Sequence, residues 1–268
     1  MTRAARRVRT LCVSALLGVL AALVGCATPP PAAPAWTPLA AEDARVAERL
    51  TALRALSAER RSLRATARVS ISGTAGESFS RQLVLAEREA KLRIEVIGVL
   101  GQRALVLASD GVAYDVYRAE TGKTETGAVD AGVLWRIARI PLLPSEAVGL
   151  LLAAPSAPAE APRGEAGPAG ELRLAWSDRS VTFDATGVLT EARVLAGAGG
   201  EELVIARFGD LRGVGAAAFP HRIDLAFPFQ KGSALLEYRE VELNAALETK
   251  WFRLVKTKVS SPTGEPRP

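Results

Sequence analysis

Few residues of this chain have the types and spacing that enzyme chemistry requires. The sequence holds one histidine, His221, and two cysteines, Cys12 and Cys26, both near the N-terminus. This set cannot build a histidine-dependent nucleophile or a His/Cys zinc site. No acid is spaced to partner His221, and acid pairs such as Glu201-Glu202 lie beside glycine-rich turns, which favours a solvated face. We therefore expect a protein that is not an enzyme and needs no metal or cofactor.

Cys26 ends a segment with the layout of a secretory signal. Arginines at positions 3, 6, 7 and 9 precede an uncharged apolar run over 11–24, which is shorter than the roughly 20 residues of a membrane span. Leu23-Val24-Gly25-Cys26 resembles the lipobox of bacterial lipoproteins. The resemblance implies that residues 1–25 are removed and that Cys26 becomes an acylated N-terminus. Because Ala27 rather than Asp follows, it also implies an outer-membrane anchor that faces the periplasm. The alternative is an ordinary signal peptide that contains a cysteine.

Charge argues against a nucleic-acid partner. The chain has 34 basic and 29 acidic residues, but four of the arginines lie in the signal, so the remaining chain is close to neutral. No basic run with interleaved aromatic residues is left to form a nucleic-acid surface. With Cys12 removed and Cys26 acylated, we also expect no disulfide, so the hydrophobic core must hold the fold.

The chain from Cys26 onward divides into a tether, one domain and a tail. Residues 26–41 are rich in proline and alanine and indicate an extended tether. Residues 42–259 have the periodicities of a single folded domain, interrupted at 155–170 by a proline- and glycine-rich stretch that we interpret as a mobile insertion loop. Residues 260–268 are polar, and we expect a disordered tail.

Apolar spacing within the domain predicts three helices and a series of strands. Helical spacing covers 42–61, 130–140 and 145–153, with Asp130 and Ser145 as candidate N-caps. Other segments alternate apolar and polar residues as half-buried strands do. Asp110-Gly111 lies between two such segments and is a strong hairpin signal. The pattern predicts an α+β fold: one strongly curved antiparallel sheet of about ten or eleven strands, with helices over an apolar concave face.

The turn over 97–102 has apolar residues where turns are usually polar. Gly98 and Gly101 permit a tight reversal, but Val99 and Leu100 occupy its tip. Two interpretations remain open at this point: the turn folds against the body and buries Leu100, or it protrudes and enters lipid.

Several segments, in their order and spacing, resemble the family of the outer-membrane lipoprotein receptor LolB. The resemblance implies an incomplete antiparallel barrel lidded by helices, with an apolar cavity for acyl chains. It further implies that the protein accepts lipoproteins from a periplasmic LolA-like carrier and inserts them into outer-membrane lipid, with Leu100 and its neighbour Val99 in the membrane-insertion loop. Val99 stands where the family often has proline. Besides the lipobox, the segments are 53–73, 92–111, 139–152, the stretch from Gly187 and the stretch from Phe219.

Acyl chains cannot cross water unshielded, so such a protein needs an apolar surface to hold them. We expect a monomer whose cavity is lined by apolar strand residues: Leu92, Ile94, Val96, Leu105, Leu107, Leu174, Trp176, Phe183, Ile223, Leu225 and Phe227. The alternative for these residues is an ordinary packed core. In that case the protein is a structural or assembly lipoprotein that binds a protein partner in the cell envelope.

Overall fold

The computed structural model describes residues 36–74 and 76–254, which belong to one compact unit that begins at Trp36. The unit has its own continuous sheet and core, as an independently folding domain does. The expected signal and Cys26 lie outside the described residues, as does the expected tail. Among the described residues, no helix is both long and apolar enough to cross a bilayer.

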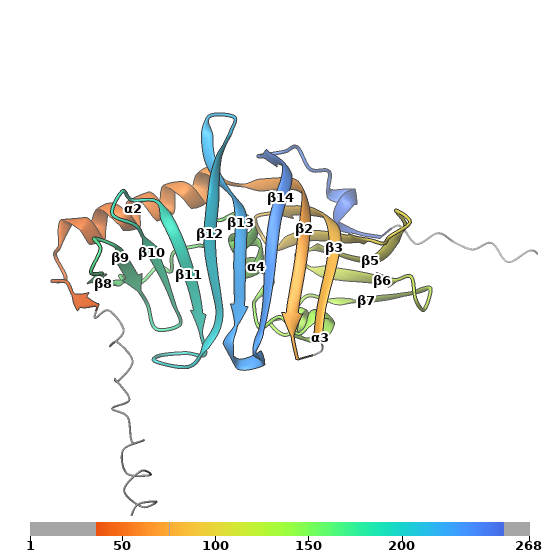
Figure 1. The fold of residues 1–268 in the computed structure, drawn as a ribbon, viewed down its shortest axis with the longest axis horizontal. Coiled ribbons are helices and arrows are strands. Elements are labelled where there is room, and N and C mark those ends of the chain that lie inside the picture. The colour runs from red at the N-terminus through yellow and green to blue at the C-terminus, as the bar shows by residue number, and fades with distance from the viewer. Residues whose placement is uncertain (1–35, 75, 255–268) are drawn as a thin grey trace, which may run out of the picture. The chain divides into compact units, whose positions relative to one another are not determined.

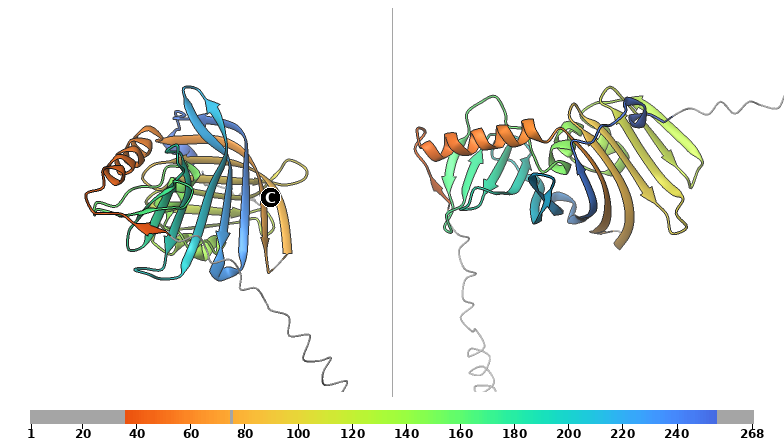
Figure 2. Two further views of the ribbon diagram at one scale, coloured as in Figure 1. Left: turned by 60° about the vertical axis from the view of Figure 1, so that its left-hand side comes forward. Right: turned by 90° about the horizontal axis from the view of Figure 1, so that it is seen from above.

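One open antiparallel sheet of 14 strands forms the body of the unit (Figure 1). Its order is β1-β8-β9-β10-β11-β12-β13-β14-β2-β3-β4-β5-β6-β7. In chain order the strands are β1 Thr37–Pro38, β2 Ser62–Gly73, β3 Gly76–Glu87, β4 Lys91–Ile97, β5 Arg103–Asp110, β6 Ala113–Arg118 and β7 Lys123–Ala128, then β8 Arg163–Ala166, β9 Leu172–Ala175, β10 Arg179–Phe183, β11 Leu189–Leu195, β12 Glu202–Val214, β13 Ala217–Phe227 and β14 Gly232–Leu243. The sheet curves strongly and stays open, since β1 and β7 are not paired with each other (Figure 2).

This architecture confirms the predicted fold class, with more strands than the sequence indicated. The additional strands include β1, β7 and β8, which are short and lack apolar alternation. Strand β8 lies within the stretch interpreted as a loop, and it pairs with β1 at the end of the expected tether. Gly164 permits this pairing beneath the neighbouring helix, because a Cβ atom there would lie 2.3 Å from Val46 Cγ2.

Three helices lie on the concave side of the sheet (Figure 2). They are α2 Ala44–Glu59, α3 Val133–Ala138 and α4 Pro144–Leu151, and two 3-10 turns, η1 Pro228–Gln230 and η2 Thr249–Phe252, follow β13 and β14. The helix positions agree with the predicted ones, but two expected N-caps are wrong. Helix α4 begins one residue before Ser145, because Pro144 suits the first helical position. Gly132 is the N-cap of α3, and Asp130 instead accepts a hydrogen bond from the Gly132 N–H.

The outer face of the sheet carries a second, smaller layer. Residues 244–254, which we call the C-terminal strap, run from the start of β2 and place η2 over β4 and β5. Phe252 is fully buried there, and Val106 and Ala108 of β5, which alternate with the inward-facing Leu107, are buried as well. The end of the strap is fixed to Asp115, which accepts hydrogen bonds from Arg253 Nε and from the Leu254 N–H, each at 2.9 Å.

We predict that Asp115→Asn loosens the strap. Burial raises the pKa of Asp115, but hydrogen bonds from Arg253, the Leu254 N–H and Thr126 outweigh it and hold the pKa below its ordinary value. The ionised carboxylate therefore stabilises the fold above its unfolded pKa of about 3.9 and loses this effect as the pH falls below that value. We expect urea denaturation at neutral pH to show a free energy of unfolding about 2 kcal/mol lower for the variant than for the wild type. Between pH 5 and pH 3 the free energy of unfolding should fall less for the variant than for the wild type.

The matched control is Asp210→Asn, which breaks an exposed ion pair with Arg212. It should leave the denaturation midpoint unchanged. Equal destabilisation by the two variants would contradict the role given to the Asp115 site.

Candidate functional site

The concave face is a continuous apolar surface built by the alternation of the strands. Cross-strand pairs bring Ile94 beside Leu107 and Ile223 beside Leu236. Ten of the eleven predicted cavity residues belong to one hydrophobic cluster on this face or pack against it. The remaining one, Val96, is half-buried opposite Leu105 near the end of β4. The structure therefore brings the predicted residues onto one face.

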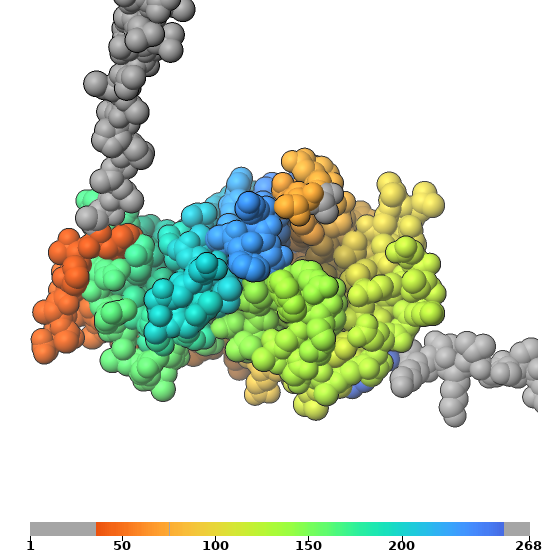
Figure 3. All heavy atoms as spheres, turned by 90° about the horizontal axis from the view of Figure 1, so that it is seen from below, coloured from red at the N-terminus to blue at the C-terminus, as the bar shows by residue number. Residues whose placement is uncertain are grey.

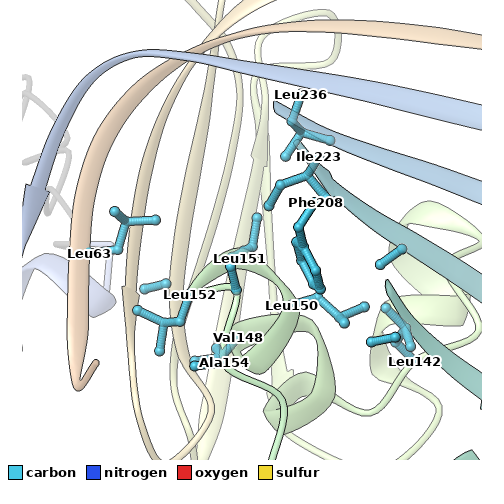
Figure 4. Packing of buried hydrophobic residues seen from close by; sticks show 14 of the residues in the cluster. Leu63, Leu142, Val148, Leu150, Leu151, Leu152, Ala154, Phe208, Ile223 and Leu236 are labelled. Atoms are coloured by element: carbon cyan, nitrogen blue, oxygen red, sulfur yellow. The ribbon is translucent and has the colours of Figure 1, made fainter. Parts of the chain in front are cut away.

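In this structure helices fill that face. We call residues 130–154, which contain α3 and α4, the lid. Its apolar residues enter the cluster from the α4 side, and Figure 4 shows Leu150 beside Phe208, with Ile223 and Leu236 above them. Between α4 and strands β10 and β11 there is a pocket of about 60 Å³, well below the roughly 300 Å³ of a small-molecule site. An acyl chain therefore does not fit into this pocket unless the lid moves.

Side chains of the body hold the C-terminal end of the lid by its backbone carbonyls. Tyr238 Oη donates to Leu151 O at 3.2 Å, and Arg60 Nη1 donates to Leu152 O at 3.3 Å and Ala153 O at 2.8 Å. Arg88 Nη2 donates to Ala154 O at 2.8 Å. The last carbonyls of a helix have no partner within the helix. Arg60, Arg88 and Tyr238 supply donors to four consecutive carbonyls, and we call these three residues the carbonyl clamp.

The clamp is electrostatically unusual because no carboxylate of the described residues pairs with its arginines. Arg60 is only 6% exposed, and its guanidinium also donates to Ala218 O at 2.6 Å and lies 5.2 Å from the centre of the Phe219 ring. Burial lowers the pKa of both Arg60 and Arg88. The negative end of the α4 dipole favours cations at this position. Burial raises the pKa of Tyr238, so its hydroxyl remains a neutral donor.

The buried clamp also has an unsatisfied donor. Arg60 Nε is buried and has no hydrogen-bond partner among the described residues. A buried donor without a partner costs free energy, so the closed arrangement is less stable than the number of its hydrogen bonds suggests.

The N-terminal part of the lid is attached by fewer contacts. Glu146 accepts from the Leu143 N–H at 2.8 Å and from Arg179 Nη2 at 3.0 Å. Gln230 Nε2 in η1 donates to Arg139 O at 2.8 Å. Trp135 and Leu143 are large apolar residues that remain 38% and 40% exposed. This part of the lid thus combines buried residues such as Val133 and Leu134 with apolar side chains that solvent reaches.

The hairpin between β4 and β5 presents its apolar tip to solvent. Val99 and Leu100 are 103% and 93% exposed. The turn satisfies its own polar groups: Gly98 N donates to Gln102 O at 2.8 Å, and Leu100 N donates to Gln102 Oε1 at 3.1 Å. Gly101 has φ +83°, which glycine adopts easily. The turn therefore protrudes and does not bury Leu100 against the body, while entry of its tip into lipid stays a prediction.

Buried charges support the hairpin from the outer face of the sheet. Glu95 is 4% exposed and pairs with Arg93 and Arg103, each at 2.6 Å, and Arg93 also donates to Trp251 O in the strap. These contacts hold the strands next to the exposed tip in place.

His221 does not form a reactive site with the described residues. It is buried in β13 rather than solvated, and its Nδ1 lies 3.2 Å from Phe219 O. Among residues 36–74 and 76–254, no group of three or more His, Cys, Asp or Glu residues is placed to hold a metal ion.

Sequence reasoning missed the carbonyl clamp. Arg60, Arg88 and Tyr238 belong to three separate segments, and all three reach a fourth segment that is distant in sequence. The one available signal is Arg60 itself, a charged residue at the end of the α2 pattern that turns out to be buried.

The comparisons with known proteins agree with this geometry at the level of the fold. No protein-family model matches the chain, and no curated protein matches it either. A LolA superfamily protein from Nitrosomonas europaea has a similar crystal structure, with a TM-score of 0.50 and 12% identity over 76% of this chain and 96% of that one. A domain assigned to outer-membrane lipoprotein sorting from Vibrio parahaemolyticus has a TM-score of 0.49 and 11% identity over 75% of this chain and 93% of that one. The chain thus has the curved, helix-covered sheet seen in the LolA superfamily protein.

Proposed function

We propose that this protein is a lipid-anchored receptor that binds lipoproteins by their acyl chains, as members of the LolB family do. In this proposal it then inserts the lipoproteins into the outer membrane. The observation that carries the proposal is the apolar concave face, which is covered by a short lid rather than by a second sheet. The fold similarity and the sequence resemblance support the same class of function.

Acyl-chain binding would follow from an exchange of apolar contacts. Displacing the lid removes its buried side chains from the cluster, Val148, Leu150 and Leu151 among them, and each such side chain contributes roughly 1.5–3 kcal/mol when buried. An incoming acyl chain restores about 0.8 kcal/mol for each buried methylene. Summed over the buried lid side chains on one hand and over the methylenes of an acyl chain on the other, these two contributions are of similar size. An acyl chain can therefore replace the lid at modest net cost in free energy. No covalent step is needed, and transfer follows from the difference in affinity between successive sites.

The exposed hairpin supplies a route to the membrane. Val99 and Leu100 are apolar, project from a supported turn and have no protein partner among the described residues. Their transfer from water into lipid is favourable. We propose that they enter the bilayer when the receptor delivers its cargo, while the acylated Cys26 and the tether over 26–41 keep the domain at the outer membrane on its periplasmic side. The partner in this scheme is a LolA-like periplasmic carrier.

A specific observation favours a second candidate. Lid residues fill the concave face, and the pocket between α4 and strands β10 and β11 has a volume of about 60 Å³. A structural or assembly lipoprotein that binds a protein partner would need no larger space. The two functions differ in whether the lid can be exchanged for an acyl chain.

Direct transfer distinguishes these functions. We expect the fragment Trp36–Pro268 to take an acylated lipoprotein from a loaded LolA-like carrier, and native mass spectrometry should detect the receptor with acylated cargo bound. Intact carrier complexes without transfer, given a folded fragment, would favour the assembly lipoprotein.

We predict that weakening the carbonyl clamp opens the lid. Tyr238→Phe removes one hydrogen bond to Leu151 O with little change in volume. Arg60→Met removes the bonds to Leu152 O and Ala153 O in the lid, together with the bond to Ala218 O in the body. A net loss of about 1–1.5 kcal/mol from the closed state raises the open fraction, and therefore the apparent affinity for a fluorescent fatty acid, by roughly tenfold. Hydrogen exchange of the α4 amides should accelerate in parallel.

Arg54→Met is the control for these clamp variants, because Arg54 lies on the exposed side of α2. It should change neither fatty-acid affinity nor exchange. If the clamp variants also leave both quantities unchanged, the lid is not a gate.

We predict that Leu100→Glu blocks insertion without harming the fold. Leu100 is exposed, so the thermal melting temperature should stay at its wild-type value. A carboxylate at the tip must be desolvated to enter lipid, so delivery of lipoprotein to vesicles should fall by at least tenfold. Val112→Glu, at the exposed β5–β6 turn, is the matched control and should deliver normally. A lower melting temperature for Leu100→Glu alone would show that the tip is structural.

A further inference from the structure

The outer face of the sheet has a wide groove beside the β4–β5 hairpin. Its volume is about 990 Å³, and strands β2, β3, β4 and β14 form its floor. Arg68 on β2 lies directly opposite Arg81 on β3, and Arg81 in turn lies opposite Ile97 on β4. Figure 3 shows the tips of the β2–β3 and β4–β5 hairpins, in orange and yellow, projecting from one side of the molecule with a hollow between them. The strap covers the neighbouring part of this face and leaves the groove open.

The groove carries an excess of positive charge. Arg68, Arg81 and Arg239 line it, and Glu240 is the one acid among the lining residues. Glu237 lies next to Arg68 across the strands and is 3.7 Å from Arg239. Within the described part of the chain, neither Arg68 nor Arg81 forms an ion pair. Two exposed guanidinium groups on adjacent strands thus face solvent without forming an ion pair of their own, and the three arginines of the groove outnumber the two acids near them.

Apolar residues accompany these cations. Phe79 is 63% exposed, and the guanidinium carbon of Arg68 lies 5.8 Å from the centre of its ring. Val99, at the exposed hairpin tip, lines the same groove. An aromatic ring, an aliphatic tip and nearby arginines form the combination that settles at a membrane interface, where apolar groups enter the acyl region and guanidinium groups stay with the phosphates.

We propose that this groove, with Arg68, Arg81 and Phe79 at its centre, docks on the headgroups of anionic phospholipids. The proposal rests on the proposed membrane insertion by the hairpin and adds the lipid class and the orientation of the receptor. Once Val99 and Leu100 enter the bilayer, the groove beside them faces the headgroup layer, and its arginines meet lipid phosphates. The contact between arginines and phosphates thus fixes the orientation of the receptor, which insertion of Val99 and Leu100 alone would leave open.

The test is flotation of the fragment Trp36–Pro268 with vesicles of phosphatidylcholine alone or with added phosphatidylglycerol. We expect binding to increase with phosphatidylglycerol and to weaken at high salt. The double variant Arg68→Gln/Arg81→Gln should bind the anionic vesicles roughly tenfold more weakly at low salt, because each basic residue near an anionic surface adds to the attraction.

The control is Arg54→Gln/Arg163→Gln, which removes the same charge from α2 and from β8, near the far end of the strand order. It should bind like the wild type. An equal loss of vesicle binding in both double variants would mean that the overall charge of the protein, not the groove, attracts the vesicles. Unchanged binding by Arg68→Gln/Arg81→Gln would also overturn the proposal. Circular dichroism melting of each variant checks the fold.

Fatty-acid binding in solution separates this proposal from the proposed function. We expect Arg68→Gln/Arg81→Gln to bind a fluorescent fatty acid as the wild type does, because the groove lies on the face opposite the lid. If the wild type binds anionic vesicles through the groove but binds no fatty acid, the receptor function fails and the docking surface stands. If it binds fatty acid but the groove variant floats normally, only the docking surface fails.

Discussion

The structure depends on one constraint: the apolar face of a curved, open sheet must be covered. Every long strand places alternate apolar residues on the concave side, and the two edges of the sheet do not join to enclose them. A closed barrel would fill its interior from its own strands, whereas this sheet relies on α2 and on the lid. The lid is short, so its burial depends on a few side chains and on how its backbone ends are satisfied.

The carbonyl clamp supplies hydrogen-bond donors to the backbone carbonyls at the C-terminal end of the lid. A helix end buried against a sheet leaves carbonyls that must find donors, and here Arg60, Arg88 and Tyr238 provide them. Hydrogen bonds to carbonyls hold the lid less strongly than buried ion pairs would, because the acceptors carry only partial charge. The unsatisfied Nε of Arg60 weakens the closed state further. The clamp therefore fixes the position of the lid through hydrogen bonds that each contribute about 0.5–3 kcal/mol.

The sequence predicted those features whose causes are local. Alternation identified most strands, three-to-four-residue spacing identified the helices, and Asp110-Gly111 marked a hairpin that the structure confirms, with Gly111 at φ +90°. Features that depend on tertiary contacts could not be predicted from the sequence. Strand β8 forms because Gly164 fits under Val46, and the clamp forms because Arg60 meets carbonyls more than 90 positions away. The eleven apolar residues could be placed on one face from their spacing, but the degree to which α4 fills that face depends on packing that no local pattern records.

The two faces of the sheet divide the work that the proposed function requires. The concave face is apolar and covered, so it suits chains that must avoid water. The outer face next to the hairpin is basic and open, so it suits a charged, hydrated surface. The β4–β5 hairpin belongs to both, since Ile94 and Leu107 point inward while Glu95 anchors Arg93 and Arg103 on the outside. In the proposed function the concave face binds acyl chains and the outer face meets the membrane, and the period-two alternation of β4 and β5 supplies side chains to both faces.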